Sequence, residues 1–364
     1  MCRTARIRAR MARTTVTMMG DSRGSSRSHP SLRARAAAPT RCLPGRELMT
    51  VRRDWRDWSC EISVVVPASA DIEVAESIVR QVMDDVSRAC SRFRADSELS
   101  VVASQLPDGA IVSELLARLV RSALDVAALT EGDVDPTLGS ALRAVGYDRD
   151  LSELPTALPG EQVDPRVTVV TRRTPGWTRV MLDQRQLAVP ADLALDLGAT
   201  AKAIAVDLAA ESVATRLGCS VLVNIGGDLK TSGPALPGGW QVLVQDLAGD
   251  PAQQVSVGEG AAIATSSTQR RTWAQGGYLR HHILDPRSGL PVEPVWRSVS
   301  VAARDCLLAN AYSTASIVRG HAAVSWLEGS GVSARLVDRA GRVITTGSWP
   351  SQLSQPQLVG VEDV

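Results

Sequence analysis

Twelve residues near the middle of the chain constrain its fold more than any other feature: they read Asp196-Leu-Gly-Ala-Thr-Ala-Lys-Ala-Ile-Ala-Val-Asp207. This apolar run predicts a helix from Asp196 to about Leu217, where Gly218 ends it. Lys202, one of only two lysines in the chain, lies near the start of that helix. Because the N-terminal end of a helix carries partial positive charge, an ammonium there is unfavourable unless an anion is bound nearby. The run therefore predicts a phosphate or nucleotide site.

Composition and charge limit the class of protein. With 44% hydrophobic and 22% charged residues, the 364-residue chain has the composition of an ordinary globular protein. Residues 1–50 carry a net charge of about +9 and are rich in Arg, Ser, Ala and Pro, so we expect a disordered basic tail there. The rest of the chain is mildly acidic, which gives no electrostatic support for nucleic-acid binding. We expect translation to begin at Met49. We expect residues 51–350 to form one domain and residues 351–364 to form a flexible tail.

The apolar segments and the cysteines indicate in which cellular compartment the protein is expected. The basic tail lacks the apolar run of a signal peptide, and no later segment offers the eighteen apolar residues of a membrane span. Six cysteines are scattered without a Cys-x-x-Cys pair, which indicates reduced thiols rather than a disulfide framework or a zinc site. These features lead us to expect a cytoplasmic protein without a membrane span.

The periodicity of apolar residues predicts the fold class. Helical periodicity covers residues 70–93, 112–130 and 306–328, in addition to the helix that starts at Asp196. Strands are predicted before, between and after these helices, at residues 60–67, 167–170, 179–182, 186–189, 220–225, 240–245, 254–257, 262–264, 279–284, 298–302, 334–337 and 343–346. Because helices and antiparallel-looking strands are intermixed rather than strictly alternating, we expect a single large α+β domain with mixed or antiparallel sheets and packed helices.

Two clusters of glycine and polar residues fall between predicted elements, where functional loops usually lie. The first, residues 132–137, contains Asp133, Val134 and Asp135 before a proline and could simply cap a helix. The second, residues 223–228, ends in Gly-Gly-Asp and could be an ordinary hairpin turn. Neither is specific when taken alone.

Two further segments carry groups that catalyse reactions or bind cations. His281 and His282 are adjacent and precede Asp285, and on a strand only one of the two histidines can face a cleft. Asn310 and Thr314 are four residues apart, so on a helix they share one face. Two oxygen side chains among alanines suit a hard cation, although such a pair is also common on an ordinary polar helix face.

The order of these segments along the chain is more specific than any one of them. Six of them, at residues 92–100, 132–137, 196–203, 223–228, 264–267 and 282–289, resemble the successive motifs of the ApbE family, and residues 309–314 fit its closing motif. That family consists of FAD:protein FMN transferases, and the resemblance covers about residues 56–350. It implies a magnesium-dependent transfer of FMN from FAD to a Thr or Ser hydroxyl of a target flavoprotein, with release of AMP.

The resemblance also implies roles for individual residues. Ala199, through its backbone carbonyl, together with Asn310 and Thr314, falls at the metal-ligand positions of the family. His282 lies beside an FAD-contact position, which makes it our candidate for the catalytic base. The remaining matches are FAD-contact positions: Asp133, Val134, Asp135, Asp196, Lys202 and Ile283.

The chain departs from the family pattern at two positions. Asn310 stands where the family usually has aspartate, which removes a negative charge from the site, and Asp305 or Asp285 could compensate. Ser267 stands where glycine is common and could narrow the pocket. Two alternatives to the transferase therefore stay open, namely an FAD pyrophosphatase that yields FMN and AMP, and a non-catalytic FAD-binding protein.

Overall fold

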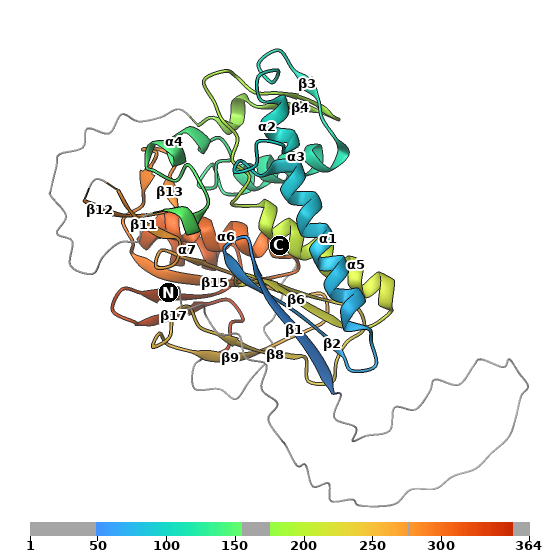
Figure 1. Cartoon of the computed structure of the whole chain (residues 1–364). Helices are drawn as coiled ribbons and strands as arrows, with labels where there is room; N and C mark the ends of the chain where they lie inside the picture. The colour runs from blue at the N-terminus through green and yellow to red at the C-terminus, as the bar shows by residue number, and fades with distance from the viewer. Residues whose placement is uncertain (1–48, 155–174, 276, 352–364) are drawn as a thin grey trace, which may run out of the picture.

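A computed structural model describes residues 49–154, 175–275 and 277–351, and its centre is one antiparallel sheet of eight strands (Figure 1). The strand order across this sheet is β1-β2-β6-β7-β10-β15-β16-β17. Their bounds are Thr50–Asp57, Cys60–Pro67, Val221–Ile225, Asp228–Ser232, Ala262–Ser267, Trp296–Ala303, Ser333–Asp338 and Val343–Thr346. The predicted α+β class is confirmed.

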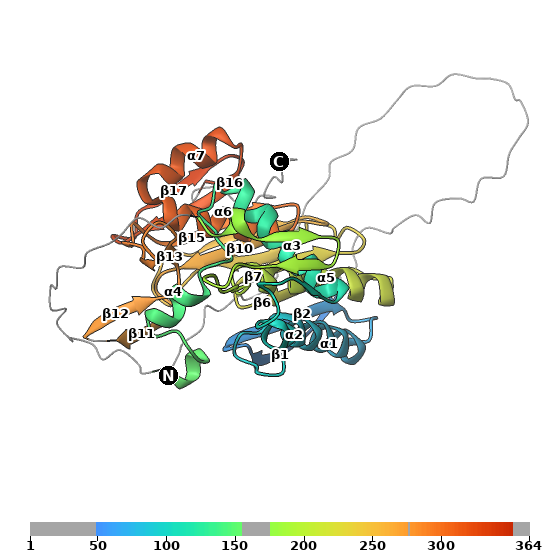
Figure 2. The ribbon, with the colours of Figure 1, turned by 90° about the horizontal axis from the view of Figure 1, so that it is seen from above.

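Helices cover one face of this sheet. Alternate apolar residues of the strands, such as Val64 and Val223, point to that face and form the main core with α1, α3, α5 and α6. Figure 2 shows α7 with β16 and β17 at one end of the molecule and α1 with β1 and β2 at the other. The helices are α1 Ile72–Cys90, α2 Glu98–Val102, α3 Glu114–Leu129, α4 Gly139–Ala144, α5 Ala201–Leu217, α6 Cys306–Arg319 and α7 Ala323–Gly329.

A two-stranded hairpin, β8 (Trp240–Val244) with β9 (Gln253–Val257), covers part of the opposite face. Its apolar residues pack on the other set of alternate strand residues, which includes Leu222, Leu229 and Ile263. The remaining short strands are β3 Ala110–Ile111, β4 Met181–Asp183, β5 Gln186–Ala188, β11 Thr272–Gln275, β12 Tyr278–His281, β13 Leu284–Asp285 and β14 Leu290–Pro291. The hairpin thus leaves part of this second face of the sheet uncovered.

A buried carboxylate ties α5 to α6. Asp207, in the middle of α5, accepts hydrogen bonds from the backbone amides of Cys306 (2.8 Å) and Leu307 (3.1 Å), the first two residues of α6. Burial raises the pKa of Asp207 to about 7. Asp305 caps the same helix by accepting from the amide of Leu308 at 2.7 Å. The otherwise unpaired amides at this helix end are therefore bound by two side chains.

Two helix boundaries differ from the prediction. The helix expected from Asp196 starts at Ala201, because Asp196 accepts a hydrogen bond from the amide of Gly198 at 2.7 Å and so forms a turn before the helix. The helix expected over residues 306–328 is interrupted at Gly320, whose φ of 56° lies in the left-handed region. A 3₁₀ turn, Gly320–Ala322, and then α7 follow.

Some predictions fall outside the described residues, namely the strand at 167–170 and nearly all of both terminal tails. Within the described part of the chain, no helix combines the length and apolar character needed to span a bilayer.

Candidate functional site

All ten predicted site residues line one cavity of about 180 Å³. It lies where the turn before α5, the helix α6 and the end of β10 meet, next to the loop after α3 and the loop between β12 and β13. The predicted residues on its wall are Asp133, Val134, Asp135, Asp196, Ala199, Lys202, His282, Ile283, Asn310 and Thr314. Ala199 and Thr314, which come from different elements, thus line the same space.

Asp196 is held at the wall by an arginine that sequence reasoning did not single out. The Nε atom of Arg92 lies 2.5 Å from Oδ2 of Asp196, and both side chains are only about a tenth exposed (11% and 10%). The guanidinium of Arg92 also stacks on the rings of Phe93 and Tyr147, with its central carbon 4.2 Å and 4.6 Å from the ring centres. Its buried Nη2 has no hydrogen-bond partner among the described residues. The 92–100 segment was the only sequence signal for this arginine.

The anion expected near Lys202 is a carboxylate of the protein itself. The Nζ atom of Lys202 lies 2.6 Å from Oδ2 of Asp228, whose side chain is fully buried. Asp228 follows Gly226 and Gly227, whose φ angles of 63° and 98° make the β6–β7 turn. A side chain at Gly226 would meet Cys60 at 2.9 Å. The charge of Lys202 is therefore compensated without a phosphate, although Lys202 still faces the cavity.

The structure separates the two adjacent histidines. His281 is buried, and its Nε2 lies 3.0 Å from the carbonyl oxygen of Val292. His282 follows β12 and lines the cavity, and its buried Nδ1 has no partner in the described part of the chain. Burial, with the nearby cations Arg271 and Lys202, holds the pKa of His282 well below its usual value near 6.5. These surroundings favour the neutral imidazole over the imidazolium.

The oxygens of α6 and of the turn before α5 form a donor set that fits a hard cation. Oδ1 of Asn310 is buried and lacks a hydrogen-bond partner among the residues that the structure describes. The hydroxyl of Thr314 lies 2.9 Å from that of Ser266 on β10. Amide, hydroxyl and backbone carbonyl oxygens are ligands that Mg²⁺ accepts. No group of three or more His, Cys, Asp or Glu side chains in the described ranges is arranged to hold a metal ion.

Two acidic residues of the cavity wall are already engaged. Oδ2 of Asp133 lies 2.5 Å from Nε of Arg319, although burial raises the pKa of Asp133. Asp135 accepts hydrogen bonds from the amide and the hydroxyl of Thr137 and from the amide of Gly176. Both carboxylates therefore have partners within the protein and help to fix the loop after α3. Neither of them caps α4.

Asn310 and Ser267, the two departures from the family pattern, both line the cavity. Neither Asp305 nor Asp285 lines the cavity, because Asp305 caps α6 and Asp285 pairs with Arg287 at 2.8 Å. Compensation for Asn310 by either residue is therefore not seen. Ser267 does line the cavity and donates to Oδ2 of Asp246 at 2.6 Å.

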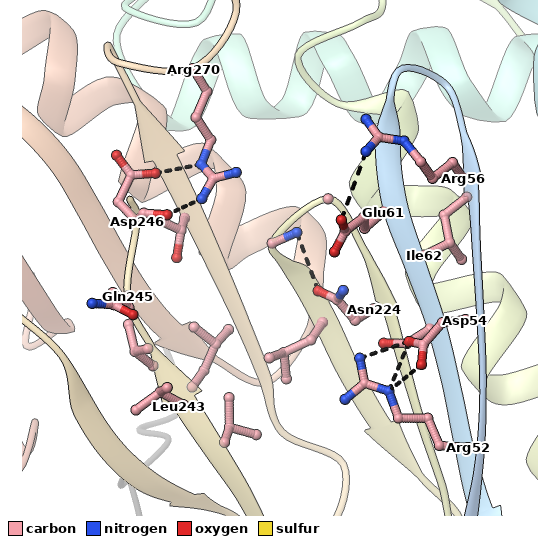
Figure 3. A pocket seen from close by; sticks show the side chains of 18 of the residues that line it. Arg52, Asp54, Arg56, Glu61, Ile62, Asn224, Leu243, Gln245, Asp246 and Arg270 are labelled. Carbon is pink, nitrogen blue, oxygen red and sulfur yellow. Dashed lines mark hydrogen bonds and ion pairs between the residues drawn. The ribbon is translucent and has the colours of Figure 1, made fainter. Parts of the chain in front are cut away.

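Two larger hollows share walls with this cavity. A hollow of about 420 Å³ shares Arg92, Phe93, Tyr147, Asp196 and Lys202, among others. A groove of about 610 Å³ shares Gly226, Thr265 and Arg270 (Figure 3). The cavity thus adjoins two wider spaces.

Comparison with known proteins gives a consistent result. The ApbE family model matches residues 57–336. The chain is similar to the FAD:protein FMN transferase of Vibrio cholerae, with 27% identity over 261 residues that cover 70% of this chain and 76% of the relative. It is also similar to the FAD:protein FMN transferase of Escherichia coli K12, with 27% identity over 270 residues that cover 70% of this chain and 73% of the relative. The crystal structure of the ApbE protein of Thermotoga maritima superposes with a TM-score of 0.70 at 24% identity, covering 82% of this chain and 97% of that one. The apo flavinyl transferase ApbE of Pseudomonas stutzeri gives a TM-score of 0.66, also at 24% identity, and covers 82% and 95%.

Proposed function

Since the chain belongs to the ApbE family, we propose that it is a FAD:protein FMN transferase, the activity in the names of its curated relatives. The proposed reaction is magnesium-dependent and joins the FMN half of FAD to a Thr or Ser hydroxyl of a target flavoprotein. The hydroxyl oxygen attacks the FMN phosphorus, the bond to the second phosphate breaks, and AMP leaves with the bonding electrons. The acceptor is thereby linked to FMN through a phosphoester.

The observation that carries this proposal is that oxygen donors and the imidazole of His282 line the same cavity. The carbonyl of Ala199 and the side chains of Asn310 and Thr314 would hold Mg²⁺, and the unpartnered Oδ1 of Asn310 supports that assignment. Bound there, the cation would neutralise the diphosphate oxygens. His282 takes the proton of the attacking hydroxyl, because its imidazole is neutral and faces the same space.

The neighbouring hollow completes the space for FAD. At about 180 Å³ the cavity alone falls short of the roughly 300–1,000 Å³ usual for ligand sites, whereas the adjoining 420 Å³ hollow extends it past Phe93 and Tyr147. Phe93, which is 42% exposed, offers an apolar contact for the substrate. Arg92, Lys202 and Arg271 supply positive charge for its phosphates.

The direct test is an incubation with FAD, Mg²⁺ and an acceptor flavoprotein, followed by mass spectrometry of the acceptor and measurement of AMP. We expect covalent FMN on the acceptor and an equal amount of AMP, both dependent on Mg²⁺. AMP without acceptor labelling would indicate a pyrophosphatase, and FAD binding without AMP would indicate a non-catalytic binder. Either result overturns the transferase assignment.

Replacing Asn310 with aspartate should strengthen magnesium binding. The substitution keeps the oxygen that lies at the cavity and adds one negative charge, and charged ligands raise the affinity for hard cations. We expect the Mg²⁺ concentration for half-maximal transfer to fall by about tenfold, a gain of about 1.4 kcal/mol. A magnesium titration of the transfer rate measures this change.

Thr314→Val is the matched comparison, since it keeps the shape of the side chain and removes the hydroxyl. It should shift the magnesium requirement upward. An Asn310→Asp variant whose requirement equals that of the unsubstituted protein would contradict the assignment of Asn310 as a ligand.

A further inference from the structure

The 610 Å³ groove lies on the face of the sheet that the helices leave open, between β1 on one side and β8 on the other (Figure 3). Its floor is a row of residues that pair directly across neighbouring strands and therefore point to the same face. From β1 to β10 this row is Asp54, Ser63, Asn224, Leu229 and Ile263. The β8–β9 hairpin packs on the same face and leaves this part of it accessible.

One wall of the groove is a free strand edge. Residues 242–245 all line the groove, although successive residues of a strand point to opposite sides. Four consecutive residues can line one space only if the backbone edge of the strand faces it. In the described part of the chain β8 pairs with β9 alone, so this edge offers unpaired amides and carbonyls to the groove.

The two strand edges of the groove differ in their charge. β1 carries Arg52, Arg53, Asp54 and Arg56, and charged side chains of this kind discourage pairing with another strand. β8 reads Trp-Gln-Val-Leu-Val and carries no charge. The β8 edge is therefore the one that can accept an added strand.

The charges on the groove wall balance each other. Arg52 pairs with Asp54 at 2.7 Å, and Arg56 lies 3.8 Å from Glu61. At the cavity end, Nε of Arg270 lies 2.5 Å from Asp246. Each of the three arginines thus has a carboxylate partner within the groove, which favours an uncharged polypeptide segment over a second nucleotide.

The groove adjoins the catalytic cavity. Gly226, Thr265 and Arg270 line both spaces. At Gly227, which lines the groove, an added Cβ would meet nothing closer than Cβ of Thr265 at 4.0 Å, so the backbone turn does not crowd this end of the groove. One end of a segment bound in the groove would therefore lie next to the cavity.

We propose that this groove binds the acceptor: an extended, uncharged segment of the target flavoprotein adds as a strand to the free edge of β8 and delivers its Thr or Ser hydroxyl past Gly226 and Thr265. This inference rests on the transferase activity proposed above. FAD and acceptor then occupy separate spaces that meet at the cavity. The backbone bonds give affinity, and the groove floor selects the side chains.

The first test uses a library of eleven-residue peptides with one central threonine and random flanks free of Ser and Thr. The protein is incubated with the library, FAD and Mg²⁺, and the best flavin-labelled sequence is identified by mass spectrometry. That peptide is then resynthesised with a single N-methyl group at each position in turn. We expect every second N-methylation to lower kcat/KM for the peptide at least tenfold, because an added strand bonds through alternate amides. Labelling that shows no alternation overturns the strand addition.

The second test fills the groove. Leu243→Trp on β8 and Gln245→Trp directly after β8 place large side chains at the groove. The matched control is Met181→Trp on β4, a 68% exposed position that does not line the groove. We expect the two groove variants to lose at least tenfold in kcat/KM for the peptide, with FAD affinity by flavin fluorescence unchanged and the control unaffected. If both variants label the peptide at the normal rate, the groove assignment is wrong while the transferase stands.

A wild-type protein that labels no peptide of the library and no flavoprotein overturns both proposals. If a tryptophan variant fails to fold, as judged by its melting temperature, the N-methyl series on the unsubstituted protein decides the question alone.

Discussion

Replacing His282 with alanine should slow flavin transfer by about 10²–10⁴-fold, the usual contribution of a general base. His282 lines the cavity and its Nδ1 has no partner among the described residues, so this nitrogen is available to the substrate. FAD affinity, measured by flavin fluorescence, should therefore change little. The matched control is His321→Ala, an exposed histidine that does not line the cavity. Equal transfer rates for the two variants would exclude His282 as the base.

The pH profile gives an independent check of the same residue. A base works in its neutral form, and burial beside Arg271 and Lys202 keeps the pKa of His282 well below 6.5. A lowered pKa extends the neutral form to lower pH, so kcat/KM for FAD, which reports the free enzyme, should show no inflection from this group between about pH 6 and 8. An inflection near 6.5 that disappears in His282→Ala would contradict the predicted lowering.

Replacing Lys202 with methionine should destabilise the fold by about 3–5 kcal/mol, since it leaves a buried carboxylate without a counter-charge. Asp228 is fully buried, its Oδ2 lies 2.6 Å from the ammonium, and its Oδ1 has no hydrogen-bond partner in the described ranges. Urea unfolding of the apo protein measures the loss in the free energy of unfolding.

The double variant Lys202→Met with Asp228→Asn separates stability from function. Neutralising Asp228 removes the uncompensated charge, so most of the lost stability should return. FAD affinity should stay low, because the cation that faces the cavity is still missing. A single Lys202→Met variant within about 1 kcal/mol of the parent would show that the pair is not the buried ion pair described here.

Local patterns predicted much of the fold. The strand over residues 60–67 and the helix end at Gly218 are confirmed, because alternation of apolar residues and a left-handed glycine are properties of a few neighbouring residues. The start of α5 was predicted five residues early, since Asp196 bonds to the amide of Gly198 and forms a turn instead of capping the helix. The break at Gly320 was missed because a single glycine in an apolar periodic segment is compatible with a continuous helix.

The sequence grouped residues that line one cavity, but it did not predict the interactions between them. The order of short motifs singled out ten positions, and the structure gathers all of them at one cavity. The partners Arg92 of Asp196 and Asp228 of Lys202 lie far from them in the sequence, and no local pattern encodes such pairs. The acceptor groove is built from β1, β8 and β10, so its shape depends on the whole sheet.

The tie between α5 and α6 through Asp207 has a consequence for the proposed metal site. The turn before α5 bears Ala199 and α6 bears Asn310 and Thr314, and the Asp207 carboxylate fixes the two helices in one register. The residues proposed to supply the three oxygens are therefore held in place before any ion binds, so we expect little ordering entropy to oppose binding of a cation. Amide hydrogen exchange in both helices should accordingly be already slow in metal-free protein and change little when magnesium is added.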